Sequence, residues 1–282
     1  MFDALDRASG SRGAGIIRAP FGYPGGKSRS VLEILPHLPY RGKYIEPFGG
    51  SAAVLLAREP NGLEVYNDAY GGVVSFYRCI RDKKMMELLV ERLELSLHAQ
   101  EDFLISKNWN VEDPIERAAR WYHSVQSSFG SIGRNWGRSM NSTSIMAGKI
   151  QSRIKYFPMI HERFKRVQVE NSDWEEIFDR YDSPTSVFYC DPPYLDVHRG
   201  TYKHEMTVKR HEEFLVKVFK TTGFVAVSGY STPMYEAHPW DERYEWSSFV
   251  SIQSTNNTEG NSKEHLAGTK RVSAQEVLWI KH

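Results

Sequence analysis

The sequence of 282 residues predicts an α/β fold in which a parallel sheet is interrupted by a helical insertion. Two short strand-like segments, 43–47 and 63–67, flank a helical stretch and form a β-α-β unit, which favours parallel pairing. Between 72 and 166 the apolar residues follow the period of helices instead. Strand-like runs return after this insertion, so we expect both halves of the chain to share one sheet.

The expected elements follow from local patterns of apolar, helix-forming and turn residues. A glycine-rich turn at 23–27 precedes, in order, a helix at 30–38, a strand at 43–47, a helix at 51–58 and a strand at 63–67. The clearest helices of the insertion are 83–100 and 114–125, and the later strands are 166–170, 186–190, 224–228 and 276–280. We expect the last strand to pair antiparallel, through a hairpin, with a strand near 247–252. Long loops are expected at 199–209 and 254–270.

Composition excludes several classes of protein. The hydrophobic content of 40% supports a real core, and no run approaches the roughly 20 apolar residues of a membrane span. Residues 1–15 are expected to form a disordered leader without the apolar region of a signal peptide, so the expected location is cytoplasmic. The two cysteines, Cys79 and Cys190, lack ligand spacing, which argues against a disulfide framework or a metal site.

Charge is distributed unevenly along the chain. The formal net charge is only +1, yet 117–166 holds ten Lys or Arg residues against one acidic residue, Glu162. Such a segment is typical of a surface that follows phosphate groups, because counterion release depends on local charge. Within it, the polar loop 127–148 interleaves arginines with aromatic residues.

The most informative motif is Asp191-Pro192-Pro193-Tyr194, which directly follows the predicted strand 186–190. An exocyclic amino group of a base is a poor nucleophile, so a catalyst must accept its hydrogens. The Asp191 carboxylate and the Pro192 carbonyl are suited to this, because two prolines remove backbone donors and stiffen the turn. Tyr194 can lie flat against a base. The alternative interpretation is a surface corner after a strand.

Two glycine-containing motifs lie near the N-terminus. Tyr23-Pro-Gly-Gly-Lys27 resembles a cradle for a nucleotide or carboxylate, although an ordinary glycine turn fits it equally well. Glu46-Pro-Phe48-Gly-Gly50 joins a strand to a helix, where Rossmann-like sheets bind cofactors, but it lacks the G-x-G-x-x-G spacing of NAD sites. The alternative role of Phe48 is packing in the core.

Two acidic residues follow later strands. Asp68 comes about twenty residues after the glycine turn, a position suited to binding two ribose hydroxyls, with an unliganded Asn-Asp turn as the alternative. Asp173 could accept a hydrogen from an adenine amino group, and Trp174 could pack on the ring. Asp173 is equally suited to capping a helix at 174–178.

Taken in order, these motifs resemble the Dam-like (alpha-group) family of N6-adenine-specific DNA methyltransferases, from residue 16 onward. The resemblance implies a Rossmann-like S-adenosylmethionine-dependent methyltransferase sheet at 16–71 and 166–282. It also implies a helical DNA target-recognition domain at 72–165, where the basic segment lies. The family pattern often ends its glycine loop in glycine, and here Ala52 takes that place, so helix and strand are expected to pack slightly differently.

The resemblance also implies roles for individual residues. S-adenosylmethionine would be the methyl donor, and an adenine flipped from double-stranded DNA would be the acceptor at Asp191, Pro192, Pro193 and Tyr194. Lys27 would contact the methionine carboxylate or the catalytic turn, and 228–230 would border the base pocket. The implied cofactor-binding residues are Tyr23, Lys27, Glu46, Phe48, Gly50, Asp68, Asp173 and Trp174. The implied DNA-binding residues are Arg134, Trp136, Arg138, Lys149 and Arg153.

Several alternatives stay open at this point. RNA adenine or cytosine N4 could replace DNA adenine as the acceptor, although aspartate at the first catalytic position favours adenine. A nucleic-acid-binding module without turnover, and a small-molecule or protein-glutamine methyltransferase, are the rivals from other classes. His123, His161, His204 and His211 are expected to be surface or phosphate contacts, because direct methyl transfer needs no histidine base. The sequence gives neither the recognition site, a restriction partner, nor the oligomeric state.

Overall fold

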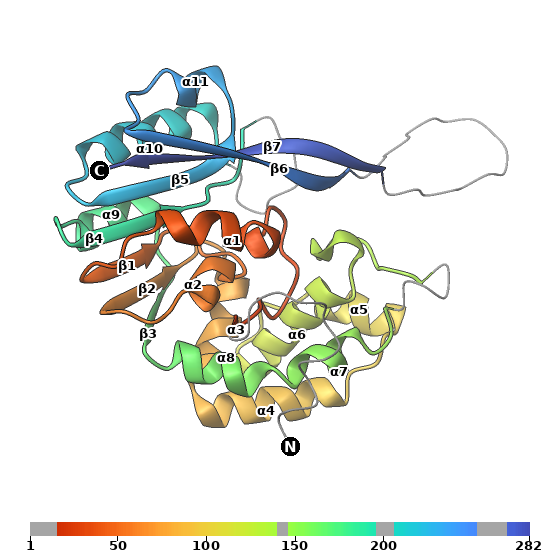
Figure 1. The fold of residues 1–282 in the computed structure, drawn as a ribbon. Coiled ribbons are helices and arrows are strands. Elements are labelled where there is room, and N and C mark those ends of the chain that lie inside the picture. Colours follow the sequence, from red (N-terminus) through yellow and green to blue (C-terminus); the bar gives the residue numbers. More distant parts are fainter. Residues whose placement is uncertain (1–15, 140–145, 196–205, 253–269) are drawn as a thin grey trace, which may run out of the picture.

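A seven-stranded sheet organises the molecule in the computed structural model, which describes residues 16–139, 146–195, 206–252 and 270–282 (Figure 1). The strand order is β3-β2-β1-β4-β5-β7-β6. The strands are β1 (Lys43–Glu46), β2 (Leu63–Asn67), β3 (Val167–Glu170), β4 (Ser186–Cys190), β5 (Phe224–Tyr230), β6 (Glu242–Ile252) and β7 (Lys270–Lys281). The first five are parallel and β7 is antiparallel to both neighbours, so the predicted α/β, Rossmann-like sheet is confirmed.

The C-terminal hairpin differs in register from the sequence prediction. β6 and β7 do form an antiparallel hairpin, but 276–280 pairs with 242–246. The stretch 247–252, its predicted partner, pairs instead with 270–275. The apolar run 277–280 marks only the inner part of a twelve-residue strand, and the outer half has too little apolar character to be recognised.

Alternating side chains divide the core between the two faces of the sheet. Ile45, Val65 and Phe188 face one cluster, which the helices α9 (Trp174–Tyr181) and α10 (Val208–Lys220) complete. Tyr44 and Tyr66, each one position away, face the other cluster, as a period of two requires. That second face packs against the short helices α1 (Val31–Ile34) and α2 (Ala53–Ala57) and against α3 (Gly71–Arg81). The last helix, α11 (Pro233–Glu236), lies beside the first cluster.

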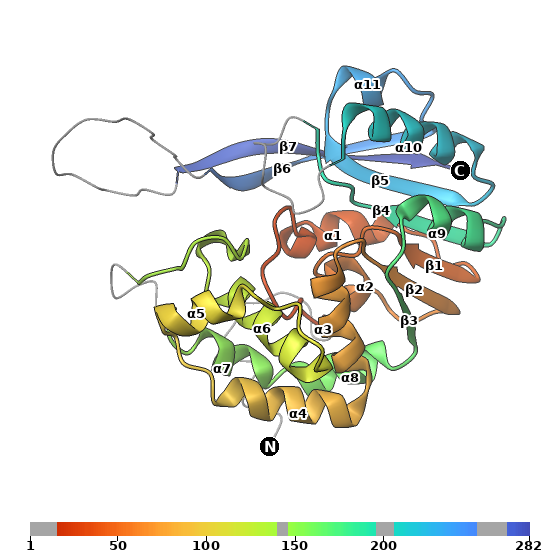
Figure 2. The same cartoon turned by 180° about the vertical axis from the view of Figure 1, so that it is seen from behind.

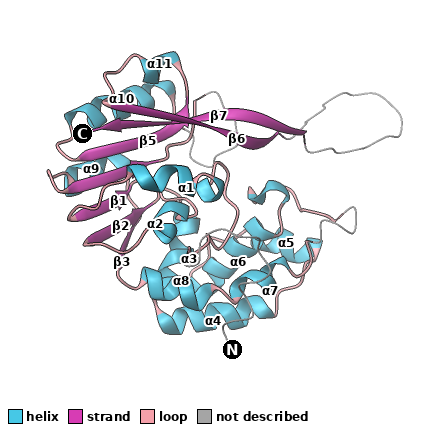
Figure 3. Cartoon of the chain, in the orientation of Figure 1, coloured by secondary structure: helices cyan, strands magenta, loops and turns pink. Residues whose placement is uncertain are grey.

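The insertion forms a helical layer on the second face (Figures 2 and 3). Its helices are α3, α4 (Lys83–Glu94), α5 (Gln100–Ser106), α6 (Pro114–Gln126), α7 (Lys149–Ile154) and α8 (Phe157–Phe164). Buried aromatic side chains join it to the sheet in one continuous core; they include Phe76, Tyr77, Trp121, Tyr122 and Phe157. No described helix is both long and apolar enough to cross a membrane.

The helix predictions were right in part. Residues 114–126 form α6, whose start is capped by the Asp113 side chain as it accepts the Glu116 N–H. A single helix over 83–100 was wrong, because α4 ends at Glu94 and Ala99 is extended. Leu95 is 81% exposed, so the apolar face of the helix is not continued there. α10 begins inside the predicted loop 199–209, while 199–205, 254–269 and the leader 1–15 lie outside the described residues.

Candidate active site

A cavity of about 320 Å³ opens at the carboxyl ends of β1, β2, β3 and β4. The strand order reverses between β1 and β4, and open α/β sheets bind ligands at such a switch point. The cofactor-binding residues predicted from separate motifs meet in this cavity with Asp191 and Pro193, whereas Pro192 and Tyr194 line a separate, much smaller pocket with Ser228 and Tyr230. The lining of the larger cavity includes Tyr23, Lys27, Glu46, Phe48, Gly50, Asp68, Asp173, Trp174, Asp191 and Pro193.

The turn at 23–27 places a buried cation inside the site. The Gly26 N–H donates to the Tyr23 carbonyl at 2.9 Å, which closes the turn, and Gly25 has a φ of 68° that favours glycine. Lys27 is only 4% exposed, and its Nζ lies 2.7 Å from Oδ1 of Asp191. Of the two expected contacts of Lys27, the structure therefore shows the one with the turn at 191–194.

The loop after β1 approaches the cavity with its backbone. Gly50 has a φ of 47°, and a Cβ atom there would lie 3.1 Å from the Tyr23 ring. Its N–H donates to Oδ2 of Asp68 at 2.8 Å. Ala52, which stands where the resembling family often has glycine, also adopts a left-handed conformation, with a φ of 53°. The glycine preference thus has a conformational origin, and alanine adopts this conformation here at a cost of about 1 kcal/mol.

Glu46 is a buried carboxyl group at the end of β1. It is 2% exposed and accepts a hydrogen bond from the Tyr44 hydroxyl at 2.7 Å. Burial raises the pKa of Glu46 to about 8, against the opposing effect of the Tyr44 hydrogen bond. The carboxyl therefore changes charge near neutral pH, directly beside the cavity.

Asp68 and Asp173 each combine a structural contact with a place in the cavity lining. Oδ1 of Asp68 accepts the Tyr70 N–H at 2.7 Å, so this carboxylate joins the end of β2 to the loop after β1. Asp173 caps α9 by accepting the Glu175 N–H at 3.0 Å, as one of its two interpretations predicted. Trp174, the first residue of α9, is 5% exposed and lines the same cavity.

The turn at 191–194, predicted to be catalytic, carries a hydrogen-bonded carboxylate. The Ser228 hydroxyl donates to Oδ1 of Asp191 at 2.9 Å, and the Tyr189 hydroxyl lies 3.1 Å from Ser228 Oγ. Lys27 Nζ is also 4.8 Å from the centre of the Tyr194 ring. The Tyr194 ring meets the Tyr230 ring edge to face, with their centres 4.7 Å apart. Pro192 is buried and Pro193 lines the cavity, so the turn is held on several sides.

The residues predicted to bind DNA separate into two groups. Arg134 is exposed and lines the cavity, and the guanidinium of Arg138 lies 5.1 Å from the centre of the Trp136 ring. Lys149 and Arg153 instead donate to the backbone carbonyls of Gln126 and Pro20. These contacts join α7 to α6 and to the N-terminal segment. A role in DNA binding stays a prediction for all five residues.

The basic segment is not uniformly a surface. Arg163, one of its ten cations, is 7% exposed and forms a buried ion pair with Glu64 on β2, with 2.5 Å between Nη1 and Oε2. Its second terminal nitrogen donates to the Leu55 carbonyl at 2.8 Å. The prediction that this cation contacts phosphate groups was therefore wrong, because its guanidinium is buried against Glu64. The sequence alone does not show that Glu64 lies beside it.

Three of the four histidines are buried, contrary to the expectation of surface contacts. His123 and His161 bond to the carbonyls of Leu97 and Ile80, and burial lowers the pKa of His123. His211 lies 2.8 Å from the Tyr235 hydroxyl, and burial lowers its pKa to about 4. His204 lies outside the described residues. The described parts of the chain hold no group of three or more potential metal-ligating side chains.

Sequence reasoning missed several residues that line the cavity. They include Tyr70, Lys107, Trp109, Tyr189 and Arg210. Tyr189 alone had a usable signal, because it precedes Asp191 by two positions and points to the same side of β4. The others reach the cavity through packing of the helical insertion or of α10, which no local pattern encodes.

Comparisons with known proteins agree on the class of protein. The model of the D12 class N6 adenine-specific DNA methyltransferase family matches residues 23–258. The type II methyltransferase M.CviBI of Paramecium bursaria Chlorella virus NC1A is 24% identical over 71% of this chain and 77% of its own length. The DNA N-6-adenine-methyltransferase of Escherichia phage P1 is 26% identical over 63% of this chain. The matched region covers only 24% of the length of that phage protein.

Among solved structures, a putative RNA methyltransferase from Pyrococcus horikoshii covers 99% of this chain and 93% of its own, with 11% identity. Its TM-score of 0.35 is too low to support an argument about fold or function.

Proposed function

The chain belongs to the D12 class N6 adenine-specific DNA methyltransferase family, and from this premise we propose that it transfers a methyl group from S-adenosylmethionine to N6 of an adenine flipped out of double-stranded DNA. The observation that supports this most strongly is the shared cavity. One hollow brings the Asp191 carboxylate together with the glycine turn, Asp68 and Asp173. A donor bound there would lie beside the group that handles the acceptor.

The proposed donor site follows the order of the strands. The carboxyl ends of β3, β2, β1 and β4 carry Asp173, Asp68, Glu46 and Asp191. This order fits an extended molecule whose adenine lies near Asp173 and Trp174, whose ribose lies near Asp68, and whose methionine end lies toward Glu46. Gly50 and the Tyr23 ring leave no space for a side chain between them, as expected of a cradle for a cofactor.

When bound, S-adenosylmethionine would supply an electrophilic methyl group. Asp191 and the Pro192 carbonyl would then accept the two hydrogens of the adenine amino group and localise its lone pair on nitrogen. Lys27 and Ser228 fix the Asp191 carboxylate in one orientation. Tyr194 would stack on the flipped adenine, while Tyr230 holds its ring from the edge. After in-line transfer, the proton released by the nitrogen would pass to Asp191 or to water.

We propose that 72–165 is the DNA-recognition domain and that 16–71 with 166–282 is the catalytic domain. The loop after α6 supports this, because it carries the exposed Arg138 beside the half-buried Trp136, and Arg134 at the cavity. Figures 1 and 2 show this loop and the outer half of the β6–β7 hairpin projecting from the same side of the sheet. DNA held there would present its backbone to cations and its flipped base to the cavity.

The experiment is a transfer assay with isotopically labelled S-adenosylmethionine and unmethylated genomic DNA, followed by nucleoside analysis and mapping of the modified positions. N6-methyladenine at a recurring sequence is the expected product. Structured RNA and an oligonucleotide without adenine serve as alternative acceptors. Label in RNA alone, or in N4-methylcytosine, would contradict the proposal and identify the acceptor that replaces DNA adenine.

A further inference from the structure

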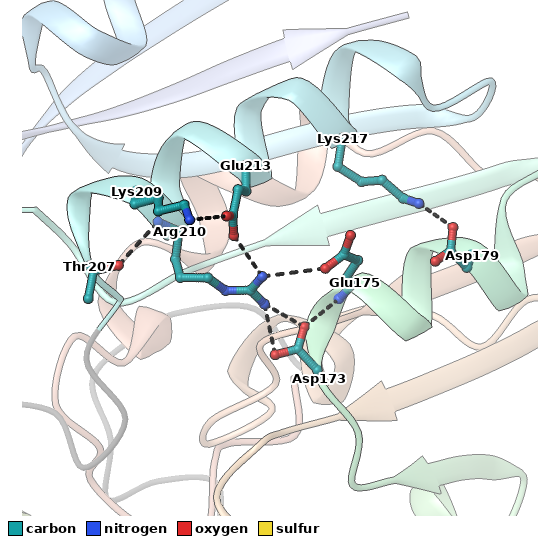
Figure 4. Close-up of polar contacts among 8 residues, drawn as sticks. All are labelled: Asp173, Glu175, Asp179, Thr207, Lys209, Arg210, Glu213 and Lys217. Atoms are coloured by element: carbon teal, nitrogen blue, oxygen red, sulfur yellow. Dashed lines mark hydrogen bonds and ion pairs between the residues drawn. The ribbon is translucent and has the colours of Figure 1, made fainter.

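Arg210 links the first turns of two helices that cover the same face of the sheet. It lies on α10, and its Nη2 donates to both carboxylate oxygens of Asp173 at the start of α9, at 2.7 and 2.8 Å (Figure 4). Nη1 donates to Glu213 at 2.9 Å and lies 3.4 Å from Glu175. The guanidinium is therefore fixed by three carboxylates at once.

The same guanidinium also contacts Trp174. Its central carbon lies 4.6 Å from the centre of the indole ring, within the range of a cation–π interaction. Arg210, Asp173 and Trp174 all line the cavity, and the Arg210 side chain is 31% exposed. Arg210 thus contacts both residues that the proposed function assigns to the adenine ring of the donor.

Asp173 retains capacity to bind a ligand in this arrangement. Its Oδ1 accepts from Arg210 and from the Glu175 N–H, whereas within the described chain Oδ2 accepts only from Arg210. A carboxylate oxygen can accept two hydrogen bonds. Arg210 therefore fixes the orientation of the carboxylate and leaves Oδ2 able to accept from an amino group in the cavity.

A neighbouring ion pair separates this role from simple docking of the two helices. Lys217 on α10 pairs with Asp179 on α9, two turns further along the same helices (Figure 4). Neither residue lines the cavity, and the Asp179 side chain is 65% exposed. If the only need were to join α9 and α10, Lys217 would serve as well as Arg210.

We propose that Arg210 is a positioning residue for the adenine ring of the methyl donor, acting through Asp173 and Trp174. This inference rests on the proposed function, since it takes S-adenosylmethionine as the donor. Arg210 holds Asp173 oriented toward the exocyclic amino group of the donor's adenine and keeps the Trp174 ring in place against the purine. The consequence is selectivity for adenine over purines that lack an amino group at this position.

The test measures binding of two probes by calorimetry: S-adenosylhomocysteine, and its inosine analogue, in which oxygen replaces the amino group of the purine. Wild type is expected to prefer the adenine probe. Arg210→Ala should bind the adenine probe about tenfold or more weakly, and should lose most of its preference over the inosine probe. Arg210→Lys keeps the charge, but a single ammonium group cannot contact Asp173, Glu213 and the Trp174 ring together as the guanidinium does. Its affinity for the adenine probe should therefore lie between those of wild type and Arg210→Ala.

Lys217→Ala is the matched control, because it removes an ion pair between the same helices outside the cavity. Its affinity for both probes should equal that of wild type. In steady-state transfer to DNA, Arg210→Ala should raise KM for S-adenosylmethionine by a larger factor than it lowers kcat. In an Asp173→Ala background, Arg210→Ala should weaken binding by a smaller factor than it does in wild type, since only the part of its effect that acts through Trp174 remains.

Other outcomes overturn the inference in distinguishable ways. Equal weakening by Arg210→Ala and Lys217→Ala would show that only helix docking matters. Wild-type affinity or undiminished adenine preference in Arg210→Ala would show that Arg210 does not position the adenine site. If wild type itself binds neither probe, the proposed donor is wrong and the inference falls with it.

Discussion

At the scale of single residues, left-handed backbone conformations shape the loop after β1, which lines the cavity. Gly50 and Ala52 have φ values of 47° and 53°, so the loop after β1 turns sharply enough to direct the Gly50 N–H at Asp68. Alanine at position 52 shows that the fold accepts the strain where the methyl group is buried in the core. At Gly50 a methyl group would point at the Tyr23 ring instead.

We therefore expect Gly50→Ala to weaken donor binding. The added methyl group displaces the Tyr23 ring, 3.1 Å away, from the cavity wall. Binding of S-adenosylhomocysteine, followed by calorimetry, should weaken by about tenfold, equivalent to about 1.4 kcal/mol. Gly148→Ala is the control, because Gly148 has a φ of 79° and an added methyl group there would meet open space within 4 Å. Both variants carry backbone strain, and equal affinity for the donor analogue in the two would contradict this account of the cradle.

The buried Glu46 carboxyl group should make the stability of the protein depend on pH. Its folded pKa of about 8 lies above its ordinary value of 4.5, so the folded state binds more protons between these values. Its stabilising contribution is complete below pH 4.5 and is lost as the pH rises through 8. The free energy of unfolding should therefore fall with pH by about 1.4 kcal/mol per unit from this group alone.

Urea denaturation at about pH 5 and about pH 8 measures this contribution when wild type is compared with Glu46→Gln. Glutamine keeps an acceptor for the Tyr44 hydroxyl but does not ionise. The difference between the two proteins should shift in favour of the variant at the higher pH. A difference that is independent of pH would show that Glu46 does not titrate in this range.

At the scale of elements, the buried pair of Arg163 and Glu64 anchors α8 to β2. Arg163→Leu should destabilise the protein by about 3–5 kcal/mol, because it leaves the Glu64 carboxylate buried without its partner. Chemical denaturation measures the loss. Replacing both residues with leucine should cost less than the single change.

The exposed pair of Arg92 and Glu116 provides the comparison. The Arg92 side chain is 44% exposed, and its replacement by alanine should cost about 0–1 kcal/mol. If Arg163→Leu proves no more costly than Arg92→Ala, the anchoring role of the buried pair is refuted.

The elements themselves were predictable where one local pattern decided the outcome. The strand 186–190 is buried along its whole length, and a continuous apolar run is what a central parallel strand requires. Asp113 and Pro114 mark the start of α6 by capping and by helix geometry. The break after Glu94 and the long outer half of the hairpin depend on which side chains find a packing surface, which the local sequence does not record.

The candidate site likewise contains residues that the local sequence places and residues that only packing brings together. Residues that directly follow parallel strands could be placed together from the sequence, because parallel strands end at one edge of the sheet. Arg210 could not be placed at the site from the sequence, because its partner Asp173 lies 37 positions away and the two residues meet only through packing of α9 and α10. The resemblance and the basic segment together predict DNA binding for Lys149 and Arg153, and the contacts of these residues with backbone carbonyls appear only in the folded chain.

At the scale of the whole molecule, the helical insertion and the edge of the sheet that carries the cavity belong to one continuous structure. The core that packs on the sheet extends into α3, α4, α6 and α8. Arg134 on the loop after α6 lines the same cavity as Lys27 and Asp68. Binding of DNA to this loop would therefore be coupled to the shape of the cavity.

Arg138→Ala is expected to weaken DNA binding almost uniformly across sequences, as for an arginine that contacts phosphate. The logarithmic dependence of affinity on salt should become shallower by about one unit. Fluorescence anisotropy at several salt concentrations measures this slope. Lys84→Ala, which removes one exposed charge from α4 on the outer side of the helical layer, should leave the slope unchanged (Figure 1). Equal effects of the two variants would indicate general attraction and not a DNA-binding surface on this loop.

The central claim is that one cavity holds the donor and the group that activates the adenine, and Asp191→Ala tests it most directly. The measurement follows labelled methyl transfer to DNA and, in the same preparation, binding of S-adenosylhomocysteine. The account predicts that wild type forms N6-methyladenine, whereas the variant still binds the donor analogue but transfers less methyl by at least about a hundredfold. Transfer at wild-type rates by Asp191→Ala would contradict the assignment of Asp191-Pro-Pro-Tyr194 as the catalytic turn.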